Sequence, residues 1–159
     1  MMLQRVARTG TAEYSRPLSM SLAGGNQAVP CAIRGGRFVA LNHLHLHVKN
    51  RPIAQEFYRS WFGMTVSRHG ECLIFLDDGK GFDLALMEDP APLALPPWFH
   101  FGFRLDSNRA VADLHDRMSR AGIAIVKPPY QDETFSSFRC ADPDGYTIEV
   151  YWEAGAAER

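Results

Sequence analysis

Several features that would assign a chain to a particular class of protein are missing here. No apolar run approaches the roughly 20 residues that a membrane-spanning helix needs. We therefore expect no membrane partner. The formal net charge over 159 residues is only -1, so we do not expect nucleic acid as a partner either. The three cysteines, Cys31, Cys72 and Cys140, are an odd number and lack the spacing of a metal-binding motif. They predict reduced thiols in a cytoplasmic protein.

The first 40 residues lack lysine altogether and hold one acidic side chain, Glu13, beside five arginines. They show no sustained period of 2 or 3.6 residues, so they predict neither a strand nor a helix. An acid-poor leader with arginine and serine is typical of an organelle transit peptide. The alternatives are a weakly structured extension or a start codon placed upstream of Met20. We expect residues 1–40 to be an N-terminal extension or leader.

The rest of the chain contains one structural unit twice. In each copy an alternating strand leads into an amphipathic helix that ends at a glycine, over residues 41–63 and again over residues 98–122. Each helix is followed by three predicted strands, at 65–68, 72–76 and 82–87 in the first copy and at 123–126, 135–141 and 146–152 in the second. The repeated order indicates a duplicated βαβββ module.

These elements predict an α+β protein in which two paired βαβββ modules form a cupped mixed sheet around a central cleft. The first module is expected over residues 41–90 and the second over residues 98–153. A proline-rich linker at 91–97 joins the modules, and a short tail at 154–159 ends the chain. One helix covers one face of each sheet, so the other face is left for a ligand.

Three residues on these open faces indicate a metal site. His43 and His100 occupy corresponding strands of the two copies, and Glu149 alternates with apolar neighbours on the last strand. Glu149 lies four residues after a turn glycine, and the corresponding position in the first copy is Ala85. Two imidazoles and one carboxylate leave coordination positions open, which is typical of a catalytic metal. Iron, manganese, nickel, cobalt or zinc would each accept this set of ligands.

Five further polar residues are expected on the same faces. A histidine can serve as acid or base near neutral pH, and an arginine suits a carboxylate or phosphonate. The predicted catalytic residues are His45, Arg139 and Tyr151, and the predicted substrate-binding residues are His47 and Arg104. The alternatives are a structural ion pair of either arginine with an acid such as Asp83, and a hydrogen-bonded or solvent-facing role for His45 and His47.

The order of these motifs resembles the vicinal oxygen chelate superfamily, which includes glyoxalase I, fosfomycin-modifying thiol transferases, bleomycin-binding proteins and extradiol dioxygenases. The matching segments are the histidine-rich strand at 41–48, Glu56-Phe-Tyr58, His100-Phe-Gly-Phe and Asp142-Pro-Asp-Gly-Tyr-Thr-Ile-Glu149. The resemblance implies a homodimer with a divalent metal held at positions that match His43, His100 and Glu149. That metal would chelate adjacent oxygens of a small-molecule substrate.

Two departures bear on the activity that the resemblance implies. Glyoxalase I usually supplies a second glutamate where this chain has Ala85, and extradiol dioxygenases place a catalytic tyrosine where this chain has Arg139. The expectation is therefore a metal-dependent enzyme of the dioxygenase, thiol transferase or isomerase/lyase type. The alternative is a metal-free small-molecule binding protein of the bleomycin-resistance type.

Overall fold

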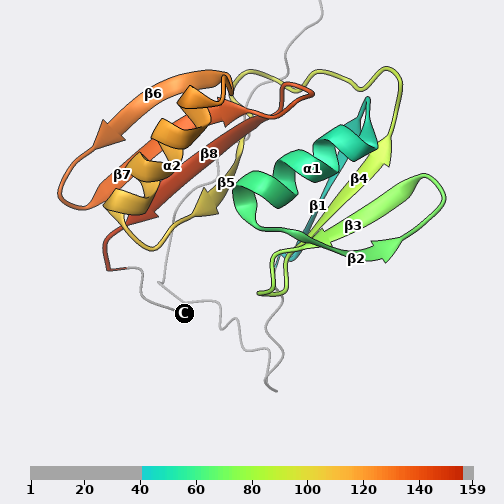
Figure 1. Ribbon diagram of the computed structural model, residues 1–159, viewed down its shortest axis with the longest axis horizontal. Helices are drawn as coiled ribbons and strands as arrows, with labels where there is room; N and C mark the ends of the chain where they lie inside the picture. The colour runs from blue at the N-terminus through green and yellow to red at the C-terminus, as the bar shows by residue number, and fades with distance from the viewer. Residues whose placement is uncertain (1–40, 156–159) are drawn as a thin grey trace, which may run out of the picture. The chain divides into compact units, whose positions relative to one another are not determined.

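The structure is a computed structural model that describes residues 41–155, and it consists of two βαβββ modules (Figure 1). The elements of the first module are β1 (His43–Val48), α1 (Arg51–Phe62), β2 (Thr65–His69), β3 (Leu73–Asp77) and β4 (Asp83–Glu88). Those of the second are β5 (Phe101–Arg104), α2 (Asn108–Arg120), β6 (Ile125–Gln131), β7 (Phe135–Ala141) and β8 (Thr147–Glu153). The predicted α+β class and the duplicated module are confirmed. The predicted extension at 1–40 lies outside the described residues.

The strands form two four-stranded mixed sheets, ordered β1-β4-β3-β2 and β5-β8-β7-β6. In each sheet the first strand of the module runs parallel to its last strand, and the other pairs are antiparallel. His45 is paired with Ala85 in the first sheet, and Gly102 is paired with Glu149 in the second. The register therefore agrees with the prediction that Ala85 corresponds to Glu149.

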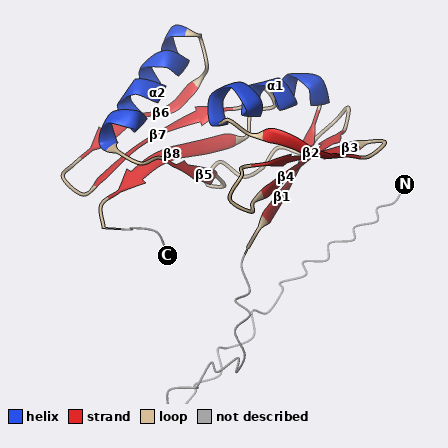
Figure 2. Cartoon of the chain, turned by 60° about the horizontal axis from the view of Figure 1, so that its bottom comes forward, coloured by secondary structure: helices blue, strands red, loops and turns tan. Residues whose placement is uncertain are grey.

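Local signals in the sequence explain where the two helices begin and end. The Asn50 side chain accepts a hydrogen bond from the Ile53 amide at the start of α1, and the Ser107 side chain does the same for Ala110 at the start of α2. Gly63 ends α1 in the left-handed conformation, with φ of 68°, where a side chain would be strained. Each helix covers one face of its own sheet (Figure 2).

The strand β6 is longer than the sequence predicts. The expected strand stops at residue 126, but β6 continues to Gln131 through Pro128 and Pro129. Prolines cannot donate to a strand ladder, and they are tolerated here because β6 is an edge strand. The pairing with β7 shifts register twice, between Ile125 and Lys127 and between Lys127 and Tyr130. The prolines therefore interrupt the pairing without ending the strand.

Side chains of both modules share one hydrophobic core. The buried cluster includes Leu46, Val48 and Tyr58 from the first module and Phe138 and Val150 from the second. Burying apolar area of this kind contributes roughly 25 cal/mol per Å². The core lies between each helix and its sheet, so the opposite sheet faces remain for polar groups.

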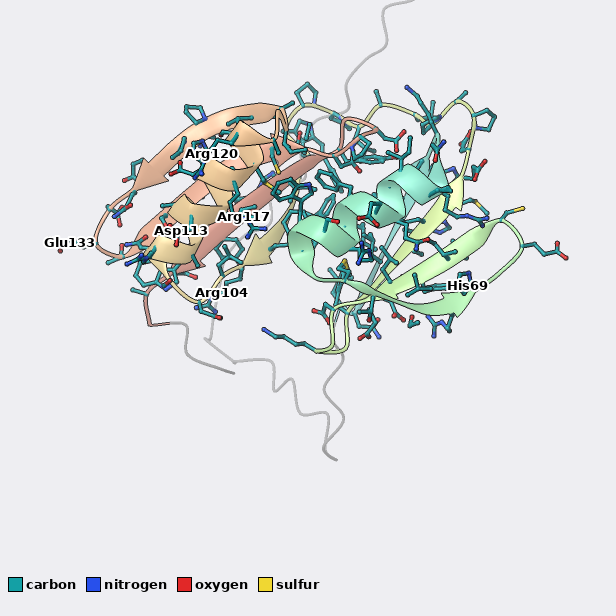
Figure 3. The ribbon with its side chains drawn as sticks, viewed as in Figure 1. His69, Arg104, Asp113, Arg117, Arg120 and Glu133 are labelled. Carbon is teal, nitrogen blue, oxygen red and sulfur yellow. The ribbon has the colours of Figure 1, made fainter. Side chains whose placement is uncertain are left out.

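Two aromatic contacts also join the modules. Phe62 at the end of α1 stacks on Phe103 of β5, with ring centroids 3.9 Å apart. The guanidinium of Arg117 on α2 lies 5.7 Å from the centre of the Trp61 ring of α1, and Arg117 is labelled in Figure 3. Stacking and cation–π contacts of this kind each contribute on the order of 1 kcal/mol.

None of the helices within residues 41–155 has the length and apolar character needed to cross a membrane. The two cysteines in this part of the chain are both free thiols, Cys72 exposed and Cys140 buried. Burial raises the pKa of the Cys140 thiol to about 12, so this thiol stays protonated and unreactive at neutral pH.

Candidate metal centre

Three side chains of the second module form a polar cluster on the sheet face opposite α2. Arg139 of β7 is paired with Glu149 of β8, and its guanidinium donates to Glu149 Oε1 at 3.2 and 3.3 Å. The same guanidinium lies 3.1 Å from His100 Nε2. His100 Nε2 is 3.5 Å from Glu149 Oε2. Two of the predicted metal ligands are thus neighbours, and a predicted catalytic arginine lies between them.

Hydrogen bonds define which nitrogen of His100 carries the proton. Its Nδ1 lies 3.0 Å from the carbonyl oxygen of Trp98, and a carbonyl can only accept, so Nδ1 is the donor. Arg139 can only donate, so Nε2 is the acceptor and has a free electron pair. A metal-binding histidine usually donates one ring N–H to a backbone carbonyl or a carboxylate, so that its other nitrogen is free to bind the metal. His100 has this arrangement.

Tyr151 forms the next part of this face, two residues beyond Glu149 on β8. Its ring lies against Gly102: a Cβ added there would be only 3.1 Å from Tyr151 Cε1. The same ring stacks with Phe135, with centroids 6.2 Å apart. Glycine at position 102 therefore leaves room for the tyrosine ring beside the His100–Glu149 pair.

The third predicted ligand, His43, is the first residue of β1. Tyr146, just before β8, donates to the carbonyl of His47 at 2.7 Å, and the Lys49 amide donates to Asp144 at 2.9 Å. The strand β8 therefore starts beside the C-terminal end of β1. His43 is four residues back from His47, which is about 13 Å along a strand.

Within the described residues the three predicted ligands are not grouped as a metal site requires. No group of three or more His, Cys, Asp or Glu side chains within residues 41–155 is placed to hold a metal ion. The structure brings His100 and Glu149 together and leaves His43 apart from them.

The open face of the first module carries its own polar pairs. His47 Nδ1 lies 2.8 Å from Asp89 Oδ2, and this hydrogen bond lowers the pKa of the Asp89 carboxyl. The rings of His45 and His47 are 5.3 Å apart between centres. Asp83 is paired with Arg68 at 2.7 Å, so it does not provide the alternative ion pair considered for Arg104 and Arg139. Arg139 is paired with another acid, Glu149. The arginine partner of Asp83 comes from its own module.

Arg104, a predicted substrate-binding residue, lies at an edge of the second module (Figure 3). It is exposed, and its guanidinium donates to the carbonyl oxygen of Glu153 at 3.0 Å. Beside it is a cavity of about 580 Å³, whose lining includes the aromatic rings of Phe82, Phe101 and Phe103. The lining also holds Lys80 and two aspartates, so the cavity combines aromatic walls with charged groups of both signs.

A buried pair that the sequence reasoning missed joins the two modules. The Tyr58 hydroxyl donates to Asp142 Oδ2 at 2.7 Å, and the amides of Asp144 and Tyr146 donate to Asp142 Oδ1. Burial raises the pKa of Asp142, although these hydrogen bonds oppose the shift. Burial also raises the pKa of Tyr58. The Asp-Pro-Asp-Gly turn was recognisable in the sequence, but nothing in it indicated the tyrosine partner.

Comparison with known proteins agrees with the fold and this arrangement of motifs. Residues 40–150 match the family model of the Glyoxalase/Bleomycin resistance protein/Dioxygenase superfamily, and the chain belongs to that superfamily. It is 31% identical over 128 residues to the uncharacterized protein PA2024 of Pseudomonas aeruginosa. The aligned residues make up 69% of this chain and 85% of the Pseudomonas protein.

Solved structures give the same result. A possible glyoxalase from Bacillus cereus is 32% identical, with a TM-score of 0.63 over 71% of this chain and 98% of that one. The fosfomycin resistance protein FosX from Listeria monocytogenes is similar in fold, with a TM-score of 0.64, 20% identity and coverage of 75% of this chain and 97% of that one. The fold resemblance that the motifs implied is therefore confirmed.

Proposed function

We propose that this protein is a metal-dependent enzyme of its superfamily, with a divalent ion held by His43, His100 and Glu149. The ion would be iron, manganese, nickel, cobalt or zinc. The observation that best supports this function is the orientation of His100, whose unprotonated Nε2 faces the Glu149 carboxylate because the Trp98 carbonyl binds Nδ1. The reaction is of the dioxygenase, thiol transferase or isomerase/lyase type.

The spacing of the two neighbouring ligands suits such an ion. Two donors bound tetrahedrally at about 2.1 Å lie about 3.4 Å from one another, and His100 Nε2 and Glu149 Oε2 are 3.5 Å apart. A cationic group, the Arg139 guanidinium, already contacts both of them. The pair therefore has the spacing and the charge preference of a cation site.

The third ligand comes from a second copy of the chain in this proposal. Within residues 41–155 His43 is not grouped with His100 and Glu149, so the proposal takes it from the partner. In a symmetric dimer the first module of each copy faces the second module of the other. Each of the two sites then receives one histidine from one chain and the His100–Glu149 pair from its partner.

The remaining residues bind and orient the substrate. When bound, the metal would polarise two neighbouring oxygens of a small substrate and stabilise the negative charge that develops there. Arg139 turns from Glu149 toward an anionic group of the substrate, and Tyr151 supplies a hydroxyl on the same face. His45 serves as acid or base from the first module, and His47 and Arg104 contact outlying parts of the substrate.

A metal-free binding protein of the bleomycin-resistance type is the second candidate. The observation that favours it is the ion pair between Arg139 and Glu149, because an arginine already neutralises the carboxylate that would bind the metal. In that case the same face would hold an organic ligand without carrying out a reaction. Metal content decides between the two candidates.

The test is a mixture of two inactive variants. His43→Ala and His100→Ala chains should each bind no metal at this site when purified alone. Unfolded together at equal amounts and refolded, they form mixed dimers in which one of the two sites has all three native ligands. We expect about one quarter of the parent's metal per chain to return at random assortment, measured by elemental analysis and by activity in a substrate screen.

Other outcomes would refute parts of the proposal. A parent without stoichiometric metal supports the metal-free binding protein. Metal in the parent, none in the separate variants and none in the mixture would place the whole site within one chain. A His69→Ala chain, which alters an exposed histidine of β2 away from the site, serves as the matched control and should keep the parent's metal.

A further inference from the structure

A second group of possible metal ligands lies on β1, apart from the His100–Glu149 pair. His45 and His47 flank the buried Leu46, so their side chains leave the same face of the strand. Both histidines are exposed, and their ring planes are inclined by 34° with centres 5.3 Å apart. Two imidazoles held two residues apart on a strand present a ready pair of nitrogen donors.

The distance between the rings suits a shared ion. A metal–imidazole bond of about 2.1 Å puts the ion about 3.2 Å from each ring centre, so two rings bound tetrahedrally have centres about 5.2 Å apart. The observed separation of 5.3 Å matches this value before any ion is bound.

Asp89 fixes one of the two rings. His47 Nδ1 is hydrogen-bonded to Asp89 Oδ2 at 2.8 Å, which leaves Nε2 as the free nitrogen. The aspartate is itself held, because its other carboxylate oxygen accepts from the Ala91 amide and its own amide donates to the Val48 carbonyl. A carboxylate behind a histidine raises its basicity and orients it toward a metal.

We propose that His45 and His47 chelate a divalent transition-metal ion, at a site separate from the His100–Glu149 pair, with Asp89 orienting His47. Imidazole nitrogens favour zinc, nickel and copper. Two protein ligands leave the other coordination positions to water or to a group from outside the chain. None of its three residues is a metal ligand in the proposed enzymatic function. An ion bound here would nevertheless occupy the two imidazoles that this function uses as acid or base and as a substrate contact, so the two roles exclude one another.

The test measures zinc binding in a chain whose proposed catalytic site has been removed. The background is the full chain with His100→Ala and Glu149→Gln, which leaves β1 unchanged. Isothermal titration calorimetry with zinc chloride should give about one ion per chain. Adding His45→Gln or His47→Gln should weaken binding at least tenfold, and Asp89→Asn should weaken it about tenfold.

Two variants in the same background serve as controls. His69→Gln changes an exposed histidine of β2, labelled in Figure 3, and should leave zinc binding unchanged. His43→Asn should also leave it unchanged, because His43 is not part of the proposed pair. Circular dichroism checks that each variant is folded.

Three results would overturn the assignment. Absence of zinc binding in the background chain would exclude a site on β1. Loss of binding with His43→Asn, together with its retention in His47→Gln, would make His43 and His45 the chelating pair. Unchanged affinity in Asp89→Asn would remove the orienting role of that carboxylate.

Discussion

The two modules share a backbone register but carry different side chains on their open faces. In the second module Arg139 is paired with Glu149, and at the corresponding positions of the first module Phe75 is paired with Ala85. The first sheet forms with an apolar pair where the second has an ion pair. The fold therefore does not require charge at these positions, which favours a functional reason for Arg139 and Glu149.

The turns before the last strand of each module make a second comparison. Asp78 Oδ1 accepts from the amides of Lys80 and Phe82, and Asp142 Oδ1 accepts from the corresponding amides of the second module. The second aspartate has an additional partner, the buried Tyr58 hydroxyl. The same local turn is thus a partly exposed cap in one module and a buried link between modules in the other.

The largest predicted effect is a difference in stability between variants of these two turns. Asp142→Ala should lower the free energy of unfolding by about 3 to 4 kcal/mol, because it leaves a buried hydroxyl and two turn amides without their acceptor. Asp78→Ala should cost about 1 kcal/mol, since Asp78 is only partly buried and water can replace much of what its carboxylate accepts. Urea unfolding of both variants measures the difference.

Asp142→Asn is the matched control for that prediction. The amide keeps an oxygen for the two turn amides and places an NH₂ group opposite the Tyr58 hydroxyl, which can accept. It should recover most of the stability lost in Asp142→Ala. Equal losses in Asp78→Ala and Asp142→Ala would mean that the link to Tyr58 contributes nothing.

The next prediction tests whether a glutamate at position 85, which corresponds to Glu149, adds a metal ligand from the first module. Ala85 is only 2% exposed, so Ala85→Glu without metal should cost about 2 to 3 kcal/mol through burial of a carboxylate. With Mn(II) or Ni(II), a fourth protein ligand should form, and metal should raise the melting temperature more in this variant than in the parent. Thermal melts with and without metal measure both effects.

Met87→Glu provides the comparison for Ala85→Glu. It adds a carboxylate two residues further along the same face of β4, where the register puts it opposite His47 rather than His45. Metal should stabilise it no more than the parent when every chain in the comparison also carries His47→Gln, which removes the separate site proposed on β1. If Ala85→Glu gains no more from metal than the parent does, Ala85 is not next to the ion and the proposed site geometry is wrong.

Much of the fold could be predicted because the relevant signals are local. Alternation predicted the strands, Asn50, Ser107 and Gly63 marked helix ends, and turn glycines gave the register that relates Ala85 to Glu149. The end of β6 was missed, since a proline pair normally argues against a strand. Only the position of β6 at the sheet edge, which is a tertiary property, permits it to continue.

The candidate site was less accessible to sequence reasoning. Strand parity put His100, Arg139 and Glu149 on one face, and the structure has them in contact. Parity says nothing about how two modules are placed, so it could not reveal that His43 is not grouped with the His100–Glu149 pair. The Tyr58–Asp142 hydrogen bond was missed for the same reason, because its partners are 84 residues apart.

The smallest predicted effect concerns a glycine without a counterpart in the first module. At the position of Gly102 the first module has His45, and Met87 takes the place of Tyr151. Gly102→Ala puts a Cβ 3.1 Å from the Tyr151 ring, so that ring must shift by a few tenths of an ångström, at a cost of about 1 kcal/mol. Most of the cost should disappear in a Tyr151→Ala background, where the Glu149 carbonyl oxygen, 3.4 Å away, is the remaining neighbour of the added methyl group. Urea unfolding of the four chains in this double-mutant cycle gives the coupling energy. A cost that persists without the Tyr151 ring would mean that the backbone of β5, rather than the tyrosine, requires glycine.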